Sequence, residues 1–203
     1  MANGLLSTLR IILWPRRRPA SAQRVCVYRI GNVGDTACAL PAIYAIRKAY
    51  PRAQLTLLTS PGRLGLPGAA ELLTGADWLD EIIVYHAHEV AGLRARLRLV
   101  RLLRKRAFDV WFEIPQDAGF AVSLRNMLAA RAVGPRWGYG WRVATIRICA
   151  QAQSELTQFP GEVDRLMTVV AQAGLPSAAP IFALPLKDQH RRAVDRLLAA
   201  RGR

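Results

Sequence analysis

Short apolar runs alternate with amphipathic stretches from residue 25 to the end of the chain. Strands are expected at "RVCVYRI", "AQLTLLTS", "DEIIVY" and "FDVWFEI". Helices are expected at 42–50, within "GAAELLTGA", and at 92–105, 118–132, 162–173 and 188–200, with "RWGYGW" as a loop or short strand and "PIFALP" as a possible last strand. Strands that alternate with helices favour an α/β fold, a mostly parallel sheet with helices on both faces.

In such a fold, ligands bind beyond the carboxyl ends of the strands. The pattern therefore predicts that a site would draw on a few short segments that follow the strands. These segments are 29–35, 60–63, 86–88, 113–117 and the surroundings of Gly138.

The first of these segments, "RIGNVGD", ends in a carboxylate, Asp35. Its glycine spacing matches neither the dinucleotide-binding fingerprint nor a phosphate-binding loop, and a carboxylate would repel a phosphate. Two readings of Asp35 stay open. It caps a helix or single turn that starts just after it, or it serves as a general base that the helix N-terminus keeps ionised. Because proline suits a first turn, Pro41 predicts a regular helix from near Leu40 and an irregular loop or kinked turn over 31–39.

The composition narrows the possible partners. The chain has 203 residues and a formal net charge of +15, which favours polyanions such as nucleic acid, anionic lipid or a phosphorylated glycan. The three cysteines form no C-x-x-C pair, which argues against a disulfide framework or a zinc site. His86 and His88 would share one face of a strand, but no third ligand is evident nearby, so no metal site is expected.

Two basic segments suggest contact with an anionic surface. Residues 1–24 form an apolar and basic N-terminal extension, in which Leu5, Leu6, Leu9, Ile12 and Leu13 would enter lipid while Arg16, Arg17 and Arg18 meet headgroups. A disordered or loosely docked extension is the alternative. Seven basic side chains between residues 94 and 106, among them Arg94, Arg98 and Arg101, surround the apolar stripe of the helix expected at 92–105. This helix either attracts anionic lipid or is simply a solvated face.

The stretch from Arg29 to Ser60 resembles the beginning of glycosyltransferase family 9, the bacterial ADP-heptose:lipopolysaccharide heptosyltransferases. Gly34, Asp35, Pro41 and Pro51 match the family pattern in order and spacing. "FDVWFEIPQ" and "RWGYGW" are similar to two later family segments, and the similarity extends over roughly residues 24 to 200. Glu113 stands where the family has Asp, and Gln116 comes one residue later than expected.

The resemblance implies a GT-B fold, in which two Rossmann-like domains face a cleft. Residues 25–185 would be the Rossmann-like acceptor domain, and 186–203 the start of a linker towards a donor-binding domain that the chain lacks. ADP-heptose would bind that absent domain, and no metal or other cofactor is implied. Asp35 matches the catalytic base of an inverting, metal-independent transfer of heptose to the lipopolysaccharide inner core. Substrate-binding positions would be Asn32, Gly34, Arg63, His86, His88, Glu113 and Gln116.

The expected partners are a lipopolysaccharide-precursor acceptor and the cytoplasmic face of the inner membrane, with the protein peripheral to that membrane and inactive alone. A non-enzymatic module that binds anionic membrane or acidic glycan is the alternative. Nucleic acid is not expected, because no helix-turn-helix pattern or aromatic-rich RNA motif accompanies the charge.

Overall fold

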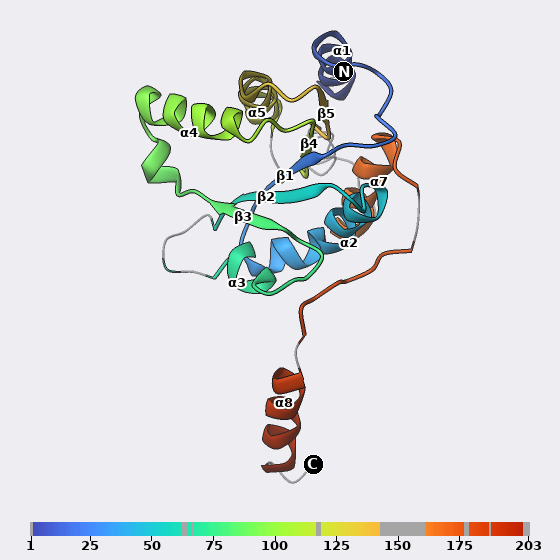
Figure 1. Ribbon diagram of the computed structural model, residues 1–203, viewed down its shortest axis with the longest axis vertical. Coiled ribbons are helices and arrows are strands. Elements are labelled where there is room, and N and C mark those ends of the chain that lie inside the picture. Colours follow the sequence, from blue (N-terminus) through green and yellow to red (C-terminus); the bar gives the residue numbers. More distant parts are fainter. Residues whose placement is uncertain are drawn as a thin grey trace, which may run out of the picture.

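A five-stranded parallel sheet forms the centre of the protein, in the order β3-β2-β1-β4-β5 (Figure 1). The computed structural model describes residues 2–61, 65, 67–116, 119–142, 161–176, 179–186 and 188–200. The strands are β1 (Arg24–Ile30), β2 (Gln54–Ser60), β3 (Glu81–Val84), β4 (Val110–Glu113) and β5 (Trp137–Tyr139). Val27 pairs with Leu57 on one side and Phe112 on the other. The predicted parallel sheet is confirmed, including a short strand within "RWGYGW".

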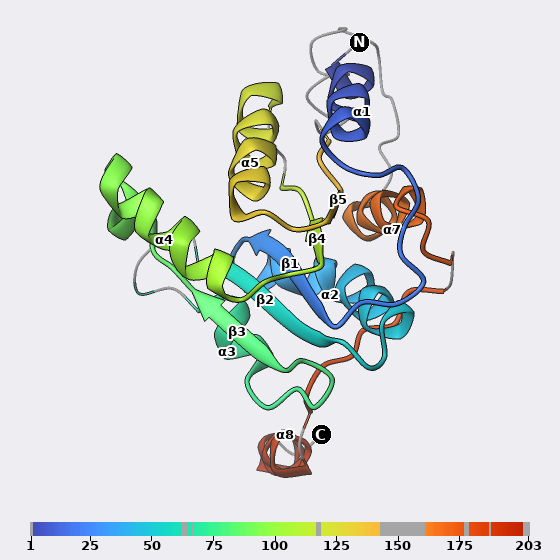
Figure 2. The ribbon, with the colours of Figure 1, turned by 45° about the horizontal axis from the view of Figure 1, so that its top comes forward.

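Helices cover both faces of the sheet, as the alternating pattern predicts. On one face lie α2 (Val33–Ala49), α3 (Ala69–Leu73) and α7 (Glu162–Gln172), which pack with Val25, Val27 and Phe112. On the other face lie α1 (Ala2–Leu13), α4 (Leu93–Lys105) and α5 (Phe120–Val133) (Figure 2). A short 3₁₀ helix, η1 (Ala87–Val90), joins β3 to α4.

Helix α1 is packed against the domain. Leu6 is fully buried, and Trp14 stacks on Trp141 with ring centroids 4.7 Å apart. The Trp14 indole donates to the Pro135 carbonyl (3.1 Å), and Arg10 lies over the Tyr139 ring. The expectation that Leu6 enters lipid is therefore wrong, because the side chain fills the core beneath α5. Leu5 and Ile12 remain exposed.

Helix α2 begins earlier than Pro41 suggests. Asn32 is its N-cap and the helix runs without interruption from Val33 to Ala49, so the predicted irregular loop over 31–39 is wrong. Pro41 removes only one backbone donor. The reciprocal cap at the N-terminus and the burial of Leu40, Ile43 and Ile46 offset that loss.

The end of the described chain leaves the sheet. The segment "PIFALP" at 180–185 forms no strand, so that prediction is wrong. The segment runs past Trp78, whose indole donates to the Ala183 carbonyl. Helix α8 (Asp188–Ala200) follows at a distance from the sheet and buries none of its side chains (Figure 1). Across the described ranges, the helices are too short or too polar to cross a bilayer.

Candidate active site at the carboxyl edge of the sheet

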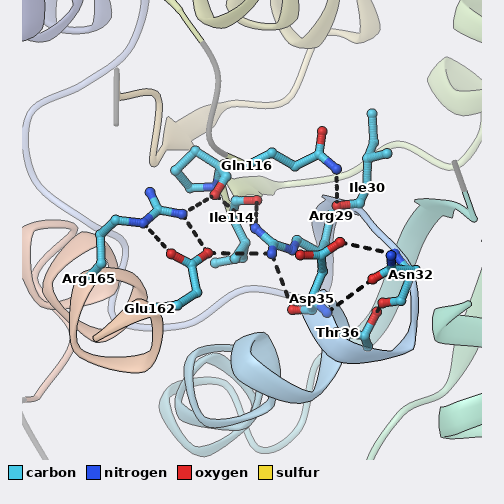
Figure 3. A network of polar contacts seen from close by, with 10 residues as sticks. Arg29, Ile30, Asn32, Asp35, Thr36, Ile114, Gln116, Glu162 and Arg165 are labelled. Carbon is cyan, nitrogen blue, oxygen red and sulfur yellow. Dashed lines mark hydrogen bonds and ion pairs between the residues drawn. The ribbon is translucent and has the colours of Figure 1, made fainter. Parts of the chain in front are cut away.

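Asp35 lies at the N-terminus of α2, immediately beyond β1. Its carboxylate accepts the backbone N–H of Asn32 (3.3 Å), and its own N–H donates to the Asn32 side-chain oxygen (3.3 Å) (Figure 3). Gly31 makes this approach possible, since a Cβ there would lie 2.5 Å from the Asp35 Cβ. Asp35 thus belongs to a capping box in which Asn32, and not Asp35, is the N-cap.

The Asp35 carboxylate keeps room for a ligand. The side chain is exposed and uses one oxygen for a single long hydrogen bond, so lone pairs on both oxygens stay free. A general base must be reachable by a substrate hydroxyl, and it benefits from a helix N-terminus that favours its negative charge. The position of Asp35 meets both conditions. The capping role is observed, while the catalytic role stays a prediction that this geometry permits.

Beneath Asp35, the side chain of Arg29 contacts three segments: the start of α2, the loop after β4, and α7. It is 2% exposed and donates to the carbonyls of Pro115 (2.8 Å) and Asp35 (3.2 Å). Burial lowers the pKa of Arg29, and the nearby Glu162 carboxylate (3.6 Å) opposes that effect. Arginine keeps its proton at any physiological pH, so a fixed positive charge lies under the α2 N-terminus.

Helix α7 completes this network. Glu162 accepts two hydrogen bonds from Arg165 (2.6 and 2.7 Å), and Arg165 also donates to the Pro115 carbonyl (2.8 Å) (Figure 3). Gln116 donates to the Ile30 carbonyl (2.6 Å). The loop after β4 is therefore held from both sides, by α7 and by the end of β1.

Sequence reasoning missed Arg29, Glu162 and Arg165 as a unit. The available signal was an arginine near the end of an otherwise apolar strand and an acid–base pair three residues apart. Neither feature indicates the other, since their contact depends on how α7 packs on α2.

Glu113 occupies the opposite face of the sheet edge. It is 4% exposed, and burial raises its pKa to about 8, although a hydrogen bond from Asn126 (2.8 Å) favours the charged form. Its Oε2 has no well-formed hydrogen bond from the described residues. The backbone is also crowded here, because a Cβ at Gly140 would lie 1.9 Å from the Glu113 carbonyl oxygen.

A pocket of about 420 Å³ lies beside the α2 N-terminus. His86, Thr59 and Gly68 are among its lining residues, and Gly68 forms a backbone bridge with Asn32. His86 follows β3, and its ring stacks on that of His88, an exposed residue of η1, at a centroid distance of 5.6 Å. Within the described ranges, no cluster of three or more His, Cys, Asp or Glu could hold a metal ion.

The predicted site residues fall into three groups. Asn32, Gly34, Asp35 and Gln116 gather around the end of β1, and a Cβ at Gly34 would meet only the Asn32 side chain, at 4.0 Å. His86 and His88 follow β3, while Glu113 is buried on the other face. Arg63 lies outside the described residues. The assignment of these residues to substrate stays a prediction.

The predicted anion-binding arginines do not share one environment. Arg16 and Arg17 are exposed, as are Arg94, Arg98 and Arg101 on α4. Arg18 instead lies over the Tyr50 ring, 5.2 Å from its centroid.

Among solved structures, the chain is similar to a glycosyl transferase family 9 protein from Veillonella parvula. The TM-score is 0.62 at 14% identity, and the match covers 92% of this chain and 52% of that one. Escherichia coli heptosyltransferase WaaC with ADP matches with a TM-score of 0.53 at 15% identity, over 79% of this chain and 51% of WaaC. WaaC with ADP-2-deoxy-2-fluoro heptose matches with a TM-score of 0.53 at 14% identity, over the same shares of the two chains.

The chain has the fold of about half of a family 9 glycosyltransferase. It spans about half the length of each of these proteins. At this identity the match establishes the fold of the chain alone. No protein-family model and no curated protein sequence matches the chain. The predicted fold, a Rossmann-like half of a GT-B enzyme, is confirmed.

Proposed function

We propose that this chain supplies the acceptor side of a heptosyltransferase-like glycosyltransferase, with Asp35 as its general base. One observation carries the proposal. An exposed carboxylate lies at a helix N-terminus, at the carboxyl edge of a sheet whose fold is that of half a family 9 glycosyltransferase. The acceptor is a lipopolysaccharide inner-core precursor, and the donor is ADP-heptose.

In the proposed reaction, Asp35 takes the proton of an acceptor hydroxyl as that oxygen attacks the anomeric carbon of heptose. The glycosidic bond forms as the bond to ADP breaks, so the configuration at the anomeric carbon inverts. The donor nucleotide binds a second domain, which stabilises the leaving diphosphate. Arg29, Glu162 and Arg165 do not touch substrate; they fix the α2 N-terminus against the loop after β4.

The division between acceptor and donor can be tested by calorimetry with two ligands. The chain should bind heptose-free inner-core saccharide, and it should not bind ADP-heptose or release ADP from it when both substrates are present. Failure to bind the saccharide would contradict the acceptor assignment. Release of ADP by the chain alone would contradict the proposal that the donor site lies in a second domain.

An anionic membrane surface is the proposed partner that brings the chain to its acceptor, because Arg16, Arg17 and the arginines of α4 are exposed cations. Deleting residues 1–18 would remove Leu6 and Trp14 from the core, so point substitutions are the better probe. Arg16→Gln with Arg17→Gln should lower co-sedimentation with phosphatidylglycerol vesicles and leave the melting temperature unchanged. Equal co-sedimentation would exclude these arginines from the membrane contact.

A further inference from the structure

An apolar groove runs between α4 and α5, over the sheet face opposite α2. Its volume is about 370 Å³, within the range of about 300 to 1,000 Å³ that small-molecule sites occupy. Figure 2 shows α4 and α5 standing over the same face of the sheet. The walls include Leu58 and Trp111 from the sheet, Val100 and Leu103 from α4, and Ala129 and Val133 from α5. Such walls suit a hydrocarbon group.

One end of the groove is polar and positively charged. Tyr28 and Tyr85 meet there through their hydroxyl groups (2.6 Å), and Arg96 and Arg125 also line the groove. Burial raises the pKa values of Tyr28, Tyr85 and Glu113, and this is the largest effect on each. The positive charge of Arg125 partly opposes it by favouring their charged forms. Glu113 interacts with both tyrosines, and its pKa of about 8 leaves it mostly uncharged at neutral pH. Arg96 and Arg125 are the charged residues in the lining of the groove.

Exposed leucines lie on the two helices that form the walls of the groove. Leu93, Leu97 and Leu102 of α4 are 73%, 44% and 47% exposed, and Leu128 of α5 is 54% exposed. Arg94, Arg98 and Arg101 are exposed on the same α4 helix. Helix α4 thus carries an apolar face, which includes the groove wall, and a separate cationic face. This arrangement is typical of helices that lie in a membrane interface, and it favours a membrane lipid over a free metabolite.

We propose that the α4–α5 groove binds one acyl chain of an anionic membrane lipid, with Arg96 and Arg125 at its headgroup. The apolar walls hold the hydrocarbon, and the cationic end selects an anionic lipid. This inference is independent of the transfer reaction and of Asp35.

Fluorescence quenching by brominated lipid tests the proposal, because Trp111 forms part of the wall. Vesicles of phosphatidylglycerol with brominated acyl chains should quench the full chain's tryptophan emission, and the same vesicles without bromine should not. Ala129→Phe fills the groove from an exposed position and should reduce this quenching at least twofold. Trp111→Phe should reduce it similarly by removing the tryptophan in the groove wall, one of five in the chain.

Two matched variants serve as controls. Ala121→Phe places the same ring at another exposed position on α5 and should leave quenching unchanged. Arg125→Gln should weaken quenching, whereas Arg131→Gln, also exposed on α5, should have little effect. Melting temperatures confirm that each variant is folded.

Three results would overturn the proposal. The first is equal quenching in wild type, Ala129→Phe and Ala121→Phe. The second is quenching by monomeric bromostearate but not by vesicles, which would identify a free fatty acid as the ligand. The third is a wild-type dimer in sedimentation that Ala129→Phe converts to a monomer, which would assign the groove to a second copy of the chain.

Discussion

Glu113 shows how the environment of one residue can alter its chemistry. An acid in a sequence is ordinarily a charged group, and the family resemblance implies that Glu113 binds substrate. In the structure the carboxyl group is buried against Asn126, and its pKa of about 8 means that the neutral form predominates at neutral pH. Sequence alone could not reveal this, because the burial depends on the packing of α5 over β4.

This raised pKa predicts a pH-dependent stability. Unfolding returns the carboxyl group to its ordinary pKa of 4.5, so between pH 4.5 and about 8 the folded state binds more protons than the unfolded state. The free energy of unfolding should therefore fall as pH rises through this window, by up to about 1.4 kcal/mol per pH unit. Glu113→Gln should remove much of this slope and be more stable than wild type at pH 9 by a few kcal/mol.

Urea unfolding at pH 5 and pH 9 measures the effect. Near pH 5 the variant and the wild type should differ little, since both carry a neutral side chain at 113. A wild-type stability that rises from pH 5 to 9 and exceeds that of Glu113→Gln at pH 9 would mean that Glu113 is ionised in the folded state.

At the scale of elements, the apolar periodicity of a helix does not show which surface its apolar residues contact, and the burial seen in the structure does. The apolar residues of α1 suit either a lipid surface or a protein core, and only the positions of Trp141 and α5 select between them. At α2, the pattern N-x-x-D contains the capping information, and the capping box and the buried face outweigh the one donor that Pro41 removes. The positions of α4, α5 and α7 agree with the helices expected at 92–105, 118–132 and 162–173.

The packing of α1 predicts a contrast between two adjacent leucines. Leu6→Ala should cost about 2 to 5 kcal/mol of unfolding free energy, because Leu6 is fully buried. Leu5→Ala should cost less than about 0.5 kcal/mol, because Leu5 is 51% exposed. Thermal unfolding of both variants provides the measurement. Equal and small losses would mean that α1 does not pack on the domain in solution.

At the scale of the whole molecule, the sequence predicted the fold well and the site in part. Alternating strands and helices fixed a parallel sheet, and its topology placed Asn32, Asp35 and Gln116 at one edge. The network of Arg29 with α7 was not foreseen, since Arg29 and Pro115 are 86 positions apart. The α4–α5 groove was not foreseen either, because a cavity depends on the angle at which two helices cross the sheet.

The central claim is that Asp35 is a general base and not only half of a capping box. Asp35→Asn keeps the size of the side chain and an oxygen that can still accept the Asn32 N–H. It loses the charge at the helix N-terminus, worth about 0.3 to 1 kcal/mol. Asp164→Asn makes the same change at an exposed position in the first turn of α7 and controls for that loss.

The deciding measurement is steady-state release of ADP from ADP-heptose by protein that joins this chain to a donor-binding half. Asp35→Asn should lower kcat by about 10² to 10⁴ with little change in acceptor KM, while Asp164→Asn retains wild-type turnover. An Asp35→Asn protein with near wild-type kcat would contradict the account and leave Asp35 as a capping residue.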